Sequence, residues 1–192
     1  GIHAVPSYEF ATPIFKLAVA PDGSLLVADA GAGIVELRNG VGSLVAELAG
    51  VTDVAPIGRG DMFALRGGGP GLTTGALFRV SRGSTQLIAD LYQFEADKNP
   101  HPTAVDSNPF EVEVLKGGDV LVAESMGEPD RSPNKVTLLR DADQDGRAEV
   151  RNTLLQGVRQ PFGMLLQGGQ LYVGNTNALV RYPYRAGDTT IT

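Results

Sequence analysis

The sequence contains no cysteine and no tryptophan, and it has only two histidines among 192 residues. Without cysteine the chain cannot form disulfides, use a thiolate nucleophile or bind zinc through sulfur. With His3 and His101 alone, a metal site built from several histidines is implausible. No apolar run approaches the ~20 residues that span a bilayer, so we expect no membrane-spanning helix.

Basic residues are also scarce, with 16 Lys and Arg against 22 Asp and Glu, which gives a net charge of −6. An acidic chain without a cluster of Lys and Arg repels phosphate backbones and anionic lipids, so neither nucleic acid nor a membrane is an expected partner. The sequence begins at Gly1 without a methionine or a signal-peptide core, which suits a trimmed or a mature chain. We therefore expect a secreted or periplasmic protein.

Glycine is abundant, with 25 residues, and proline adds 12. So many turn-forming residues disfavour a helical bundle and indicate short strands joined by tight turns. Hydrophobic residues make up 42% of the chain against 20% charged, which is enough to form a core. The length suits one domain, so we predict a single all-β domain.

One apolar pentad occurs four times, and each copy follows a glycine-containing turn that favours a hairpin. The copies are Leu25–Asp29, Met62–Arg66, Val120–Glu124 and Leu171–Asn175. A hairpin unit that recurs every ~40–60 residues is the signature of a β-propeller blade. The pentads are apolar on both faces, as strands sandwiched between neighbouring blades should be.

Extending each pentad outward predicts a β-propeller of four four-stranded antiparallel blades. We expect the blades at about residues 13–50, 51–93, 108–157 and 158–192, with a long loop over 93–108 and a last strand at Thr189–Thr192. Four blades is the lower limit of the usual range of about 4 to 8. The ring either closes alone, with Val5–Phe10 latching onto the last blade, or forms part of a larger ring that a second copy completes as a homodimer.

Parts of the sequence resemble two propeller families. Residues 15–109, above all Leu17–Asp29 and Ala104–Phe110, resemble propeller proteins associated with scytonemin biosynthesis clusters. From Gly118 onward, segments 119–125, 136–146 and 160–164 resemble the opening part of the glucose/sorbosone dehydrogenases, which use pyrroloquinoline quinone (PQQ). This resemblance implies a propeller and sugar oxidation with PQQ. In that family the catalytic histidine and the basic residues around the quinone lie on later blades, so no such residue is carried over to this chain.

The strongest local motif is an acidic loop that follows Arg140. It places carboxylates at its first, third, fifth and ninth positions: Asp141, Asp143, Asp145 and Glu149. Gly146 permits a sharp turn, and the carbonyl of Arg147 supplies a further oxygen, which is the chemistry that calcium prefers. Asn152 at the twelfth position excludes a helix–loop–helix site and favours a hairpin loop. The alternative is a solvated acidic turn, but four carboxylates this close repel one another, so we favour bound Ca²⁺.

The long connections of the predicted meander all emerge on one face, which we call the long-loop face. They are residues 67–75, 93–108 and 126–134, and long loops on a rigid face commonly carry binding. We expect a small molecule or a protein to bind there. The candidate ligand-binding residues are Asp29, Arg66, Glu124, Asn175, Asp53 and Asp106. The alternative is that each of them caps its own turn or bonds the next blade.

His101 is the candidate catalytic base, because an unperturbed imidazole titrates near neutral pH. The alternative is that it is a surface or packing residue between two prolines. The sequence as a whole predicts a calcium-stabilised propeller that serves as a binding or scaffold module without a complete active site. The alternative function is a PQQ-dependent sugar or sorbosone oxidoreductase, or part of one.

Overall fold

The structure is a computed structural model, and it describes residues 10, 12–67, 74–98, 109–125 and 133–192. Within these residues the chain forms fifteen strands and one helix. Blade 1 contains β1 (Ile14–Val19), β2 (Leu25–Asp29), β3 (Gly33–Arg38) and β4 (Val41–Glu47). Blade 2 contains β5 (Val51–Pro56), β6 (Met62–Arg66), β7 (Ala76–Ser81) and β8 (Ser84–Asp90). Blade 3 contains β9 (Pro109–Val114), β10 (Val120–Glu124), β11 (Lys135–Arg140) and β12 (Val150–Gln156), and blade 4 contains β13 (Gly163–Gln167), β14 (Gln170–Gly174) and β15 (Leu179–Pro183).

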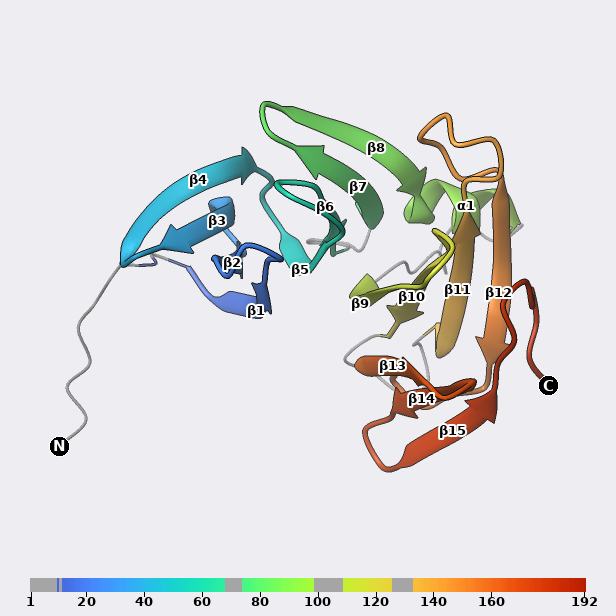
Figure 1. The fold of residues 1–192 in the computed structure, drawn as a ribbon. Helices are drawn as coiled ribbons and strands as arrows, with labels where there is room; N and C mark the ends of the chain where they lie inside the picture. Colours follow the sequence, from blue (N-terminus) through green and yellow to red (C-terminus); the bar gives the residue numbers. More distant parts are fainter. Residues whose placement is uncertain (1–9, 11, 68–73, 99–108, 126–132) are drawn as a thin grey trace, which may run out of the picture.

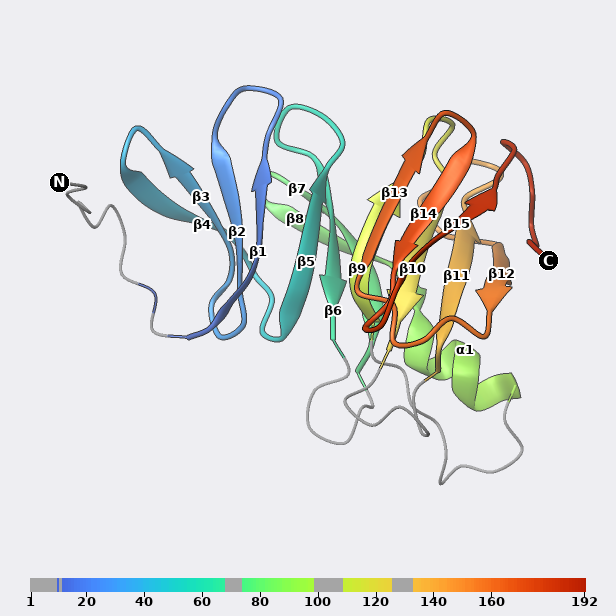
Figure 2. The same ribbon diagram turned by 90° about the horizontal axis from the view of Figure 1, so that it is seen from below.

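Each blade is an antiparallel meander whose strands pair in sequence order. The first strand of each blade lies innermost, and β1, β5, β9 and β13 contact one another in turn. Figures 1 and 2 show the four sheets side by side in an arc that is open between blade 1 and blade 4. The predicted all-β propeller with four blades is therefore confirmed.

The last blade differs from the prediction because it has three strands rather than four. Residues 189–192 form no strand beside β15. A turn at Asp188, whose carboxylate accepts the N–H of Arg185 at 2.8 Å, redirects the chain toward blade 3. There Ile191 donates its N–H to the carbonyl of Leu154 at 2.6 Å and packs against the core, so the C-terminus lies beside β12 in Figure 1.

A second difference is helix α1 (Leu91–Lys98), which occupies the start of the segment that we predicted as a long loop. Asp90 caps the helix by accepting the N–H of Gln93 at 2.8 Å, and Leu91, the first residue of the helix, is buried. The helix is short, it has a single capping residue, and a proline-containing stretch follows it. The sequence pattern therefore favours a loop. No helix among the described residues has the length and apolarity needed to cross a membrane.

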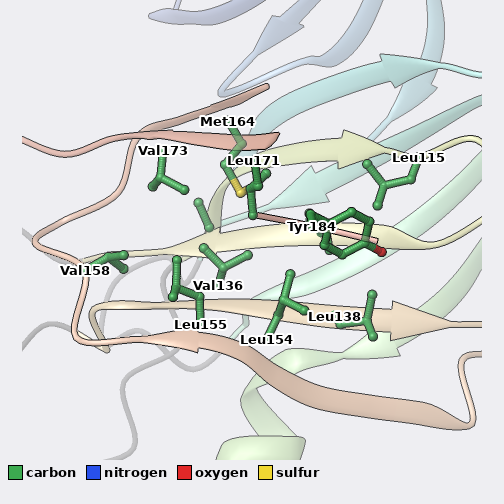
Figure 3. Close-up of a cluster of buried hydrophobic side chains, with 12 residues drawn as sticks. Leu115, Val136, Leu138, Leu154, Leu155, Val158, Met164, Leu171, Val173 and Tyr184 are labelled. Carbon is green, nitrogen blue, oxygen red and sulfur yellow. The ribbon is translucent and has the colours of Figure 1, made fainter. Parts of the chain in front are cut away.

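The core consists of apolar layers between consecutive blades rather than one central cluster. One layer lies between blades 1 and 2, another between blades 2 and 3, and a third between blades 3 and 4. Figure 3 shows the third layer, to which Leu138 and Leu154 of blade 3 and Met164 and Leu171 of blade 4 contribute. Interior blades therefore bury both faces, which is why their pentads are apolar throughout.

A polar contact also repeats in the first three blades. An aspartate in the turn before the second strand pairs with an arginine on the third strand, and this contact holds the turn on the blade. The pairs are Asp22–Arg38, Asp61–Arg79 and Asp119–Arg140. In blade 3 the pair is bidentate, with both N···O distances 2.7 Å.

The layered core gives a direct stability test. We expect Leu138→Ala to lower the free energy of unfolding by about 2–4 kcal/mol, because it opens a cavity where the native side chain has no exposed surface. The matched control Leu87→Ala, on outer strand β8 where the side chain is 47% exposed, should cost less than about 1 kcal/mol. Urea denaturation measures both values, and equal costs would contradict a core that lies between blades.

Candidate functional site

Charged side chains occupy one register position on the innermost strands. Lys16, Asp53 and Glu111 lie opposite Ala28, Leu65 and Ala123 of the second strands, the fourth residue of each pentad. In blade 4 the same position is Gly163, opposite Gly174. Because the blades repeat around one axis, equivalent positions on adjacent inner strands come close together. We call Lys16, Asp53 and Glu111 the inner-strand cluster.

The inner-strand cluster links three blades. The ammonium of Lys16 donates to both oxygens of Glu111 at 3.0 Å, and it lies 3.5 Å from Oδ1 of Asp53. Asp53 is almost fully buried and accepts the N–H of Val112 in blade 3 at 2.8 Å, as well as the N–H of Val54 at 2.7 Å. Blade 1 is therefore tied to blades 2 and 3 by one cation, and blade 2 to blade 3 by one carboxylate.

Burial shapes the charge state of this cluster. Loss of solvent raises the pKa of Glu111 to about 7, and the neighbouring charge of Asp53 adds to the effect, while Lys16 opposes it. Burial also raises the pKa of Asp53, against the hydrogen bond from Val112 and the charge of Lys16. For Lys16, burial disfavours the ammonium, but the charges of Asp53 and Glu111 raise its pKa overall. Glu111 is thus a carboxyl that can exchange a proton near neutral pH.

Two of the candidate ligand-binding residues are buried at the ends of second strands. Asp29 accepts hydrogen bonds from the N–H groups of Gly31 and Ala32 at 2.9 and 2.8 Å and from the hydroxyl of Thr12. Although burial opposes it, these hydrogen bonds hold the pKa of Asp29 below its usual range. Glu124 accepts from the hydroxyl of Thr137 in its own blade.

The other two strand-end candidates also make contacts within their own blades. Arg66 donates from Nε to the carbonyl of Thr74 at 3.0 Å and lies 5.0 Å from the centre of the Phe78 ring. Asn175 accepts the N–H of Arg159 at 3.3 Å. Each of these side chains is therefore held at its blade end, on the side from which β6 and β10 lead into the long connections. Their role in ligand binding stays a prediction.

His101 and Asp106 lie outside the described residues, so the candidate base and one candidate ligand-binding residue have no structural account. The same holds for most of the segment Val5–Phe10. The long-loop face is described through the strand ends and α1, which Figure 2 shows at the same end of the blades.

The acidic loop brings its four carboxylates together between β11 and β12. Asp141, Asp143, Asp145 and Glu149 each place one oxygen within 4.8 Å of the others. The N–H of Gly146 donates to Oδ2 of Asp141 at 2.9 Å, and Gly146 has a φ of 90°, a backbone conformation that side chains disfavour. Oδ1 of Asp141 is buried and has no hydrogen-bond partner among the described residues. The loop therefore presents oxygen ligands in a conformation that backbone hydrogen bonds already hold in place.

The loop also docks on blade 2. Gln86 of β8 donates from its side-chain amide to the carbonyl of Gly146 at 3.1 Å, and Ala148 donates its N–H to the carbonyl of Ile88 at 3.3 Å. Ala148 itself is part of the apolar layer between blades 2 and 3. The loop is thus part of the contact between blades 2 and 3.

Sequence reasoning found Asp53 but missed Lys16 and Glu111. Both are charged residues inside segments correctly predicted as innermost strands, and a charge in that position of a propeller faces the axis or a neighbouring blade. Aligning the pentads and reading the first-strand residue opposite the fourth pentad position would have found all three members.

The comparisons with known proteins show the fold of this chain and no sequence family. No family model matches the chain, and no curated protein sequence matches it. Among solved structures it is similar to the WD40 β-propeller domain of Doa1, with 14% identity and a TM-score of 0.62, covering 93% of this chain and 53% of that one. It is also similar to a putative gluconolactonase, with 16% identity, a TM-score of 0.55 and coverages of 88% and 57%.

A third similar structure is a putative glucose dehydrogenase of Thermus thermophilus, with 17% identity, a TM-score of 0.56 and coverages of 92% and 63%. At these identities the likeness shows the β-propeller fold alone. The chain spans less than two thirds of the length of each of these structures.

The raised pKa of Glu111 predicts a pH-dependent stability. The folded state holds this proton more tightly than the unfolded chain, whose carboxyl has the ordinary pKa of 4.5, so ionising Glu111 in the folded protein reduces stability as pH rises from 4.5 to about 7. We expect Glu111→Gln, which still accepts from Lys16, to be more stable than the wild type by about 1–3 kcal/mol at pH 8 and to lose that advantage below pH 4.5.

Urea unfolding from pH 4 to 8 measures this difference. Asp97→Asn, at an exposed carboxylate on α1, is the matched control for removing one negative charge. A Glu111→Gln advantage that stays constant across the range would show that the carboxyl is not the titrating group.

Proposed function

We propose that this chain is a calcium-stabilised β-propeller module that binds a small molecule or a protein on its long-loop face. The observation that carries the calcium part is the convergence of the four carboxylates of the acidic loop within 4.8 Å of one another. One of them, Asp141, also has a buried oxygen without a hydrogen-bond partner among the described residues. A hard divalent cation would offset the repulsion among these four carboxylates.

The donor set fits calcium and not zinc or copper. Carboxylate oxygens, with the carbonyl of Arg147, are hard ligands, and the described loop offers neither sulfur nor imidazole. Extracellular calcium modules commonly have weak affinity, about 10⁻⁴–10⁻³ M, because the ion is abundant outside cells. A secreted or periplasmic location is part of this proposal for the same reason.

The binding part of the proposal is supported by the strand ends at the long-loop face. Asp29 and Glu124 are buried polar residues whose positions are fixed by hydrogen bonds, and Arg66 is oriented by Thr74 and Phe78. Polar groups held in place before a ligand arrives lose little entropy on binding.

Removing one carboxylate tests the calcium site. We expect calcium to raise the melting temperature of the wild type by several degrees, and Asp143→Ala to abolish most of that rise, because the loop loses one of its four charged ligands. Asp97→Ala removes an exposed carboxylate on α1 and is the control for net charge. Thermal melts with and without a chelator measure the effect, and equal calcium responses in Asp143→Ala and the wild type would reduce the loop to an acidic turn.

The second candidate function is a PQQ-dependent sugar oxidoreductase, or part of one, and the similarity to a putative glucose dehydrogenase favours it. PQQ carries several carboxylates and is held best by basic residues. The inner-strand cluster instead has two acidic residues for one lysine, so these residues do not fit the quinone. Any quinone site would need basic residues outside the cluster.

An assay of the purified chain with PQQ, calcium, an aldose and a dye acceptor separates the two functions. We expect no dye reduction above a control without protein, and no change in the PQQ absorption spectrum on adding the chain. Sugar-dependent dye reduction would contradict the proposed binding module and support the oxidoreductase.

A further inference from the structure

Each end blade exposes apolar side chains on one face, although Val27 and Val35 on that face of blade 1 are fully buried. The internal repeat shows what the equivalent faces contact in the other blades. In each blade, the third residue of the pentad and the inner-strand residue opposite it in the register both face the preceding blade. The inner-strand residues at this position are Leu17, Val54, Val112 and Met164. In blades 2 to 4 they are 2%, 4% and 8% exposed, whereas Leu17 in blade 1 is 56% exposed.

The opposite face shows the same break in the pattern at blade 4. The fourth pentad position, with its partner on the third strand, faces the following blade. The third-strand residues there are Ile34, Leu77, Val136 and Leu179. The first three are fully buried, and Leu179 is 73% exposed. Among the described residues, no blade precedes blade 1 and none follows blade 4.

The two free faces carry side chains of different size at the positions that meet in the contact between consecutive blades. On blade 4, Gly163 and Gly174 lie opposite each other where the other blades have larger residues, and a groove of about 350 Å³ runs over them beside Leu165 and Leu179. On blade 1 the projecting residue is Leu17, which is larger than the valines at the same position in blades 2 and 3. A larger side chain on one face therefore matches a deeper groove on the other.

One pair of exposed side chains on the two faces carries opposite charges. Glu47 lies on the free face of blade 1, in the row of Gly33, and Arg181 lies on the free face of blade 4, in the row of Tyr172 and Leu165. Because Glu47 and Arg181 carry opposite charges, they do not repel each other when the two faces meet.

We propose that a second copy of this chain covers both faces, with blade 4 of each copy packed on blade 1 of the other. The contact repeats the one that consecutive blades already make within the chain, so it needs no new type of interface. Two four-bladed copies give eight blades, within the range of about 4 to 8 in known propellers. A two-copy ring contains the contact twice, so each contact needs only about half of the ~1,600 Å² of a standard-size interface.

Single charges on each face test this arrangement. We expect the wild-type chain to be a dimer by sedimentation velocity at micromolar concentrations. Leu17→Glu and Leu179→Glu should each be monomeric, with dissociation constants raised on the order of 100-fold, because each buries an unpaired carboxylate at both contacts. Both positions are exposed in the single chain, so the variants should keep the wild-type circular dichroism spectrum. Leu87→Glu, at an exposed leucine on an outer strand of blade 2, is the control and should stay dimeric.

Mixing the two monomeric variants distinguishes this pairing from others. Leu17→Glu retains an intact blade 4 face and Leu179→Glu an intact blade 1 face. An equimolar mixture should therefore form a heterodimer through its one intact contact, more weakly than the wild type and at a protein concentration well above the wild-type dissociation constant. If blade 1 paired with blade 1, or blade 4 with blade 4, one of the single variants would still dimerise and the mixture would show nothing new. A monomeric wild type, a dimeric single variant, a mixture that stays monomeric or a monomeric Leu87→Glu would each overturn the proposal.

Discussion

The structure depends on one requirement, that every blade buries both faces against its neighbours. A four-stranded sheet of this composition has apolar side chains on both sides, and neither side can be left in water without a large loss of hydrophobic stabilisation. The interior blades meet the requirement through the three apolar layers. The end blades cannot meet it within the open arc, and their exposed Leu17 and Leu179 follow from the same rule that buries their equivalents.

The repeat in the sequence was enough to predict the blades, because the pentads carry the burial pattern and the turns before them carry the hairpins. All four pentads form second strands, although β14 ends at Gly174 and leaves Asn175 outside. The absence of a fourth strand in blade 4 could not be predicted, because residues 189–192 have a strand-like composition. Only the contact of Ile191 with Leu154 decides where they lie. Helix α1 was missed because it rests on a single cap at Asp90.

The candidate sites differ in how far the sequence reveals them. The acidic loop is local, so its residue spacing was sufficient to predict that the four carboxylates converge. The inner-strand cluster joins residues far apart in the chain, Lys16 and Glu111 among them, and their contact depends on how three blades are placed around the axis. Asp53 was found as a candidate on its own, but its bond to Val112 in the next blade could be seen only in the structure.

These polar contacts fix the position of one blade along the next, which the apolar layers alone do not determine. Hydrophobic burial is nondirectional, so a blade shifted along its neighbour by two residues loses little of it. A hydrogen bond has a short range and a preferred angle. The bond from Val112 to Asp53 at the inner strands and the bond from Gln86 to Gly146 at the outer strands fix blades 2 and 3 at both ends of their contact. We infer that the buried charge of Asp53 is retained for this register, since its raised pKa shows that burial opposes its ionised form.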